Sequence, residues 1–137
     1  MAQQKKINDK RFYPRVPVKL PAVVANEDGI RLNVVTLDTS SDGIRIQCTT
    51  AERNLMTPEG SLIRNGRPVE LLVWIDLPDP EGGEAQIFAR CHITFSRRVA
   101  KDICQIGMRY MTIENDGLSK LNHFIASESV SNDCSLY

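Results

Sequence analysis

The sequence predicts a mainly β fold, a six-stranded antiparallel β-barrel with one α-helix near its C-terminal end. Segments in which apolar and polar residues alternate recur at short intervals, and Gly, Pro and Asp residues separate them. Only one stretch with an apolar stripe at helical spacing follows these segments. Nothing between the strands is long and helically periodic enough to form the crossovers of a parallel sheet. The 137 residues suit a single domain.

The first half of the chain predicts three strands. Residues 16–25 are rich in β-branched residues, and their two prolines indicate an edge position or a late strand start. Residues 27–29, Glu-Asp-Gly, predict a hairpin turn, and residues 30–34 return with one apolar face. The polar residues 38–43 are expected in a loop, after which residues 44–48 alternate as a third half-buried strand.

The middle of the chain predicts an irregular segment and two further strands. Residues 51–68 contain several prolines and glycines, with room for a short helical turn near residues 52–56. Residues 69–77 form a strongly apolar strand that ends at a Pro- and Gly-rich break. Residues 87–95 carry the longest regular alternation, so we expect neighbouring strands on both sides.

The last strand and the helix complete the prediction. A polar turn is expected at residues 97–102, followed by a strand over residues 103–113. Asp116 is in position to cap a helix from Leu118 to about Ala126. Its apolar stripe consists of Leu118, Leu121, Phe124 and Ile125. The expected organisation is a flexible leader over residues 1–9, a domain over 10–126 and a flexible tail over 127–137.

Composition narrows the class of protein. Seventeen basic and seventeen acidic residues cancel, which argues against a binder of long polyanions, yet residues 1–20 hold six cationic side chains and one carboxylate. No signal peptide and no apolar run of membrane-spanning length is found, so a cytoplasmic location is expected. The four cysteines, with only two histidines, lack zinc-ligand spacing; buried free thiols are favoured over a disulfide framework.

Two short clusters point to a binding site for guanine and phosphate. Arg11 and Arg15 bracket the first cluster, and a guanidinium group can grip a phosphate or the O6/N7 edge of guanine. Asp38, Ser40 and Gly43 form the second, where a carboxylate can accept hydrogen bonds from the N1–H and N2–H of guanine. The plainer alternatives are a solvated basic leader and a simple Asx-type turn.

The spacing Arg11-x-x-x-Arg15 followed by Asp38-x-Ser40-x-x-Gly43 resembles the signature of the PilZ domain, the bacterial receptor for cyclic di-GMP. The resemblance covers roughly residues 10–126. It implies a six-stranded barrel of the split type, with an N-terminal arginine segment that folds over the ligand. Arg11 and Arg15 would meet guanine or phosphate, Asp38 and Ser40 would bind the base or phosphate, and Gly43 would provide a turn or a close backbone approach.

Four further residues have both a functional and a structural interpretation. A cationic residue at Lys10 resembles family members that hold a self-stacked pair of ligand molecules; otherwise it is a solvated lysine. Trp74 either covers a purine ring, as aromatic residues do in similar domains, or packs in the fold. Arg45 and Arg109 point away from the apolar faces and either reinforce the anion site or are merely solvated.

The predicted function is therefore that of a cyclic di-GMP receptor, with no cofactor and no metal, that orders its N-terminal segment on binding and signals to a partner protein. The alternative is a PilZ-like adaptor in motility or pilus machinery that binds no nucleotide. An oligonucleotide-binding barrel is disfavoured because only 6% of residues are aromatic. An enzyme is disfavoured because no catalytic motif is present.

Overall fold

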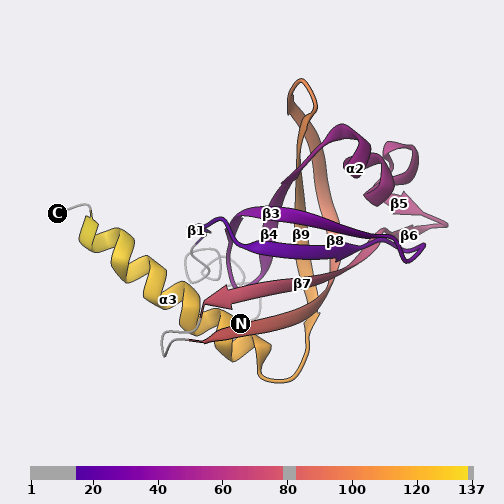
Figure 1. The fold of residues 1–137 in the computed structure, drawn as a ribbon. Helices are drawn as coiled ribbons and strands as arrows, with labels where there is room; N and C mark the ends of the chain where they lie inside the picture. Colours follow the sequence, from indigo (N-terminus) through magenta and orange to yellow (C-terminus); the bar gives the residue numbers. More distant parts are fainter. Residues whose placement is uncertain (1–14, 79–82, 136–137) are drawn as a thin grey trace, which may run out of the picture.

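The computed structural model describes residues 15–78 and 83–135, and its core is a closed antiparallel barrel (Figure 1). The sheet order is β1-β3-β2-β7-β8-β9-β4, and pairing between β3 and β4 closes six of these strands into a ring, with β1 added beside β3. The predicted six-stranded barrel is thus confirmed. The strands are β1 (Val16–Pro17), β2 (Pro21–Ala25), β3 (Arg31–Thr39), β4 (Gly43–Cys48), β7 (Glu70–Pro78), β8 (Glu84–Ala100) and β9 (Ile103–Ile113).

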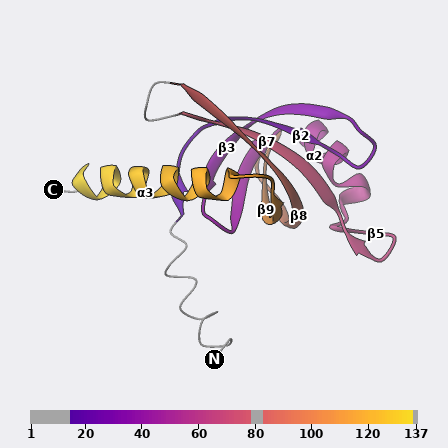
Figure 2. The same ribbon diagram turned by 90° about the horizontal axis from the view of Figure 1, so that it is seen from below.

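Short elements cover the end of the barrel away from the C-terminal helix (Figures 1 and 2). They are α2 (Thr50–Met56), η1 (Pro58–Gly60), β5 (Ile63–Arg64) and β6 (Arg67–Pro68). Thr49 begins α2 with a reciprocal capping box, in which its side chain accepts from the Glu52 amide and the Glu52 carboxylate accepts from the Thr49 amide. The helical turn predicted near residues 52–56 is confirmed.

Alternation along each strand fills the barrel interior with apolar side chains. Ile46, Leu71, Val73, Ala89 and Ile106 are fully buried, and the outward neighbours are mostly polar. Such alternation follows from the period of two along a β-strand, which sends successive side chains to opposite faces. Cys48, Cys91 and Cys104 are buried free thiols.

A register shift in β3 breaks this alternation and positions the site. Thr36 pairs with Ile46, but the next partners are Asp38 and Arg45, so one extra residue is inserted at Leu37. A bulge of this kind re-aims the side chains that follow it. As a result, Asp38 shares the outer face of the barrel with Arg45 instead of pointing inward with the core.

Helix α3 (Gly117–Ser135) packs its first turns against the barrel and then extends away from it (Figures 1 and 2). Leu121, Phe124 and Ile125 are buried, as predicted, but Leu118 is 46% exposed and does not belong to the packed stripe. The predicted end near Ala126 was too early, since the helix continues to Ser135. Within the described residues, none of the helices combines the length and apolar character needed to cross a membrane.

Two predicted loops are shorter than expected. Asp38 belongs to β3 and Gly43 to β4, so residues 40–42 alone connect the two strands. Strand β8 continues to Ala100, and only Lys101 and Asp102 turn the chain into β9. In both cases a neighbouring strand supplies backbone partners to polar residues that have a loop-like composition.

Candidate functional site: a guanidinium–carboxylate cluster

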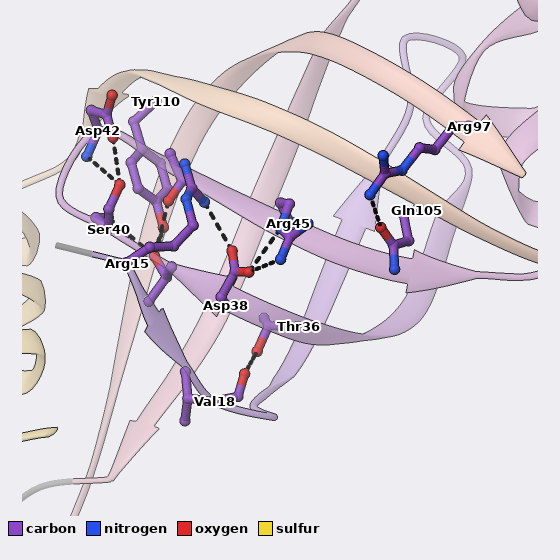
Figure 3. Close-up of polar contacts among 12 residues, drawn as sticks. Arg15, Val18, Thr36, Asp38, Ser40, Asp42, Arg45, Arg97, Gln105 and Tyr110 are labelled. Carbon is purple, nitrogen blue, oxygen red and sulfur yellow. Dashed lines mark hydrogen bonds and ion pairs between the residues drawn. The ribbon is translucent and has the colours of Figure 1, made fainter. Parts of the chain in front are cut away.

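Asp38 lies between two arginines on the outer face of the barrel (Figure 3). Arg15 donates from Nη1 to Oδ1 of Asp38 at 2.9 Å, and Arg45 donates from Nε to Oδ2 at 2.7 Å, with a further ion pair from Arg45 Nη2 to Oδ2. The Asp38 side chain is only 7% exposed, whereas those of Arg15 and Arg45 are 43% and 33% exposed. Both carboxylate oxygens are therefore engaged, and the arginines form a basic cover that faces solvent.

The loop after Asp38 is held by its own hydrogen bonds. The Ser40 hydroxyl donates to the Asp42 carboxylate and accepts from the Asp42 amide at 3.3 Å. Thr39 Oγ1 lies 2.8 Å from the Tyr110 hydroxyl, and the Tyr110 amide donates to the Asp42 carbonyl at 2.9 Å. Burial raises the pKa of the Tyr110 phenol, so this hydroxyl stays protonated as a link between loop and barrel.

Gly43 is required by a close approach between β4 and β9. A Cβ placed on Gly43 would lie 2.5 Å from the carbonyl oxygen of Met108, a backbone atom that cannot move without separating the strands. Gly43 does not need a left-handed backbone, because it is absent from the positive-φ residues of the described chain. Of the two roles expected for this glycine, the structure thus supports the close approach, directed at the neighbouring strand.

The charge state of Asp38 depends on its two partners. Burial by itself would raise the pKa of Asp38, but the hydrogen bonds and positive charges of Arg45 and Arg15 outweigh burial and hold this pKa below its ordinary value. Asp38 is consequently ionised at neutral pH and available as an acceptor. The same pairing raises the pKa of Arg45.

Replacing Arg45 by glutamine is expected to raise the pKa of Asp38, because one of its two guanidinium partners is lost. Since the folded-state pKa lies below the unfolded value of about 3.9, the pairing stabilises the fold above that pH, and this stabilisation is lost as pH falls through the folded-state pKa. Carboxyl carbon NMR titration measures the shift, and Arg97→Gln is the control that should leave Asp38 unchanged. An identical Asp38 titration in the wild type and Arg45→Gln would contradict the assignment.

The structure brings some predicted site residues together and separates another. Arg15, Asp38, Ser40 and Gly43 converge around the β3–β4 connection, as expected. Arg11 and Lys10 lie outside the described residues. The turn alternative describes Ser40, whose hydroxyl accepts from the Asp42 amide, but not Asp38, whose hydrogen bonds go to guanidinium groups.

Trp74 lies apart from this cluster, on the outer face of β7. Its ring centroid is 4.9 Å from that of Phe88, and the Arg31 guanidinium lies 4.6 Å from the ring centroid. The strand register places Trp74 level with Asn33 of β3, two strands away. Asp38 is farther along β3 by roughly 16 Å, at about 3.3 Å per residue. These contacts support the packing interpretation, and a ligand contact by Trp74 stays a prediction.

Arg45 is the site residue that sequence reasoning left undecided. Its outward position was visible in the alternation of residues 44–48, but its partner was not, because the alternation in residues 30–34 does not reveal the bulge at Leu37. Register alone makes Arg45 the cross-strand partner of Asp38. Opposite charges directly across an antiparallel pair stabilise it.

A hollow of about 840 Å³ lies elsewhere, between the β2–β3 turn and the β5–β6 hairpin. Glu27, Asp28 and Glu70 contribute carboxylates to its lining, beside Arg64. Arg67 and His92 also line it, so three carboxylates and two guanidinium groups leave this hollow without a net positive charge that would favour an anionic ligand. Among the described residues, no group of three or more Asp, Glu, His or Cys side chains is arranged to hold a metal ion.

A family model described as the PilZ domain matches residues 9–127. The chain belongs to the PilZ domain family, a family of cyclic di-GMP receptors.

Solved structures share this fold. The Bacillus subtilis inhibitor of motility, MotI/DgrA, is similar over 87% of this chain and 51% of its own, with 16% identity and a TM-score of 0.67. The PilZ domain of YcgR from Escherichia coli, solved with c-di-GMP, is similar over 90% of this chain and 95% of its own, with 13% identity and a TM-score of 0.52. This chain thus spans about half of the Bacillus protein. A comparison with curated protein sequences finds no match.

Proposed function

We propose that this protein is a cyclic di-GMP receptor whose binding face is centred on Asp38. The observation that supports this most is the convergence of Arg15, Asp38 and Arg45 from three separate strands or strand ends. A guanidinium pair next to an ionised, shielded carboxylate offers donors for phosphate or the guanine O6/N7 edge and an acceptor for guanine N1–H and N2–H.

Ligand binding is an exchange of partners at Asp38. A carboxylate that is only 7% exposed needs hydrogen-bond donors at all times, and at present both oxygens receive them from arginines. Guanine presents two parallel donors, N1–H and N2–H, which replace one arginine at the Asp38 carboxylate. The released guanidinium is then free to bind a phosphate, so the charge pairing lost at the carboxylate is recovered on the ligand.

The output of the receptor follows from the position of Arg15. This residue immediately precedes β1, which is the added strand beside β3, so a ligand gripped by Arg15 also fixes the path of the segment before it. Arg11 and Lys10 belong to that segment. Ordering it across the barrel creates a new surface that a partner protein can recognise in the liganded state only.

Calorimetric titration with cyclic di-GMP tests the proposal and gives the stoichiometry. Cyclic di-AMP is the matched ligand. It keeps the stacking purine rings and both phosphates, but adenine lacks the N1–H and N2–H groups whose hydrogen bonds Asp38 would accept. We expect binding of cyclic di-GMP at micromolar concentration or tighter and at least tenfold weaker binding of cyclic di-AMP. Equal affinities would show that Asp38 does not read guanine.

The second candidate is an adaptor that acts only through protein contacts. The closed Asp38 cluster favours it, since the carboxylate is satisfied without any ligand. Thermal shift separates the candidates: a ligand present at a hundred times its Kd stabilises the native state by about 2.7 kcal/mol. An unchanged melting temperature at millimolar cyclic di-GMP would favour the adaptor.

A further inference from the structure

Strand β8 continues past its neighbour β7 and leaves one of its sides without a partner. Pairing between the two strands begins at Glu70 with His92, and the Ile93 amide still donates to the Val69 carbonyl at 3.2 Å. Beyond Ile93, residues 95–100 pair with β9, and no strand of the described chain pairs with their other side. The sheet therefore has an open edge here, and such an edge is a template for pairing with another chain.

The backbone of this edge has groups directed at the open side. Alternate residues of an antiparallel strand direct their N–H and C=O groups to opposite sides, and residues 95–98 are in continuous register with residues 104–107 of β9. Within the described chain, no backbone group outside β9 is hydrogen-bonded to residues 95–98. Register shifts at residues 93–95 and 98–100 bound this regular stretch, so an added strand would be short.

The hairpin that carries the edge stands clear of the barrel, at the top of the view in Figure 1. Residues 97–103 are all exposed to solvent. They include two β-branched side chains, Val99 and Ile103, which are 46% and 36% exposed. Since β-branched residues pack well against a neighbouring strand, the composition of the hairpin suits a partner that the described chain does not supply.

The charge of the hairpin determines which strand can pair with it. Residues 94–104 contain three cations, Arg97, Arg98 and Lys101, and one carboxylate, Asp102, which accepts from the first amide of α2 at 3.1 Å. Within the described residues none of the three cations forms an ion pair, and Arg97 donates to the neutral amide of Gln105. An acidic segment is therefore complementary to this edge.

The two arginines lie on opposite faces of β8. Arg97 is level with Gln105 on the outer face, and Arg98 is level with Cys104, whose side chain is buried on the inner face. Phe95 shares the outer face with Arg97, because side chains two residues apart point the same way. An added strand would meet a cation on either face, so two neighbouring acidic residues and an apolar residue beside Phe95 fit this edge.

We propose that residues 94–100 are a docking site at which an extended acidic segment of a partner protein adds a strand beside β8. Backbone hydrogen bonds to the open edge provide affinity, and Arg97 and Arg98 provide selectivity. A second copy of this chain is not the occupant, because two such edges would bring like charges together. The docking site does not depend on nucleotide binding at Asp38, so it goes beyond the proposed function.

A synthetic peptide titrated into the isotope-labelled protein tests the site. The probe has a central Glu-Glu pair between valine and threonine residues. One control has Lys-Lys in place of this pair, and a second control is N-methylated on its backbone amides, which removes the donors and keeps the charges. We expect the Glu-Glu peptide to shift the amide NMR signals of residues 94–100, and each control to bind about fivefold more weakly or worse.

Charge reversal on the protein gives an independent test. Arg98→Glu places a carboxylate beside the acidic peptide, so its affinity should fall about tenfold, while the Lys-Lys peptide should bind more tightly than it does to the wild type. Lys120→Glu is the control. It makes the same change from cation to anion on α3, which packs at the other end of the barrel, and should leave peptide affinity unchanged (Figure 1).

Three results would overturn the proposal. If the N-methylated peptide binds as tightly as the Glu-Glu peptide, charge alone holds the peptide and no strand is added. If Arg98→Glu binds the acidic peptide as the wild type does, the hairpin cations do not select the partner. If anionic lipid vesicles shift the signals of residues 94–100 and the acidic peptide at millimolar concentration does not, the hairpin binds a lipid surface and not an acidic strand.

Discussion

Replacing Arg15 or Asp38 by alanine is expected to weaken cyclic di-GMP binding at least tenfold in each case. One well-formed bidentate contact between a protein group and guanine contributes about 1–3 kcal/mol, and each substitution removes such a contact. Stability should change little, with the melting temperature lowered by no more than a few degrees. In Arg15→Ala the Asp38 carboxylate keeps its pairing with Arg45, and in Asp38→Ala the partly exposed guanidinium groups are solvated. Calorimetry and thermal unfolding measure the two quantities.

A matched control keeps this result specific. Asp76→Ala removes an outward carboxylate of β7 that accepts from Gln86 and has no contact with the cluster, so its affinity should equal that of the wild type. Unchanged affinity in both Arg15→Ala and Asp38→Ala would remove the site assignment. An equal loss of affinity in Asp76→Ala would show that the change in net charge, and not a contact with the ligand, weakens binding.

The substitution Gly43→Ala is expected to cause the largest loss of stability. The new Cβ would stand 2.5 Å from the Met108 carbonyl oxygen, and the atoms on both sides of this contact belong to paired strands. Overpacking of this kind costs about 1–3 kcal/mol, and relief requires the neighbouring strands β4 and β9 to separate. Urea denaturation of Gly43→Ala against the wild type measures the change in the free energy of unfolding.

Gln47→Ala is the control for this experiment. Gln47 is an exposed, outward residue of the same strand, so its truncation should change stability by less than about 0.5 kcal/mol. If Gly43→Ala is as stable as the wild type, the strands tolerate the extra methyl group and the close approach is not the reason for the glycine.

The strands of this protein were predictable because most of them are exposed to solvent on one face and buried on the other. Residues 44–48 and 87–95 alternate and residues 69–77 are strongly apolar, and the structure pairs all three segments in the barrel. Alternation fails as a guide where a strand leaves the core. Residues 97–100 were therefore expected in a turn, although pairing with β9 keeps them extended.

For helix α3, the apolar stripe predicted most of the burial correctly, but not all of it. Helical spacing identified Leu121, Phe124 and Ile125 as a packed face, and they are buried. It also assigned Leu118 to that face, but this side chain is 46% exposed. An apolar stripe indicates that a helix packs, and the partner surface decides how much of the stripe is covered.

By itself the sequence determined the barrel, the terminal helix and the paired motif around Arg15, Asp38, Ser40 and Gly43, because periodicity and motif spacing are local properties of the chain. Only the tertiary structure decided that Arg45 completes the carboxylate pairing and that Trp74 stands apart. Those relations depend on strand register. A single extra residue at Leu37 turns Asp38 from the core face to the outer face, and such an insertion becomes visible only when the neighbouring strand is in place.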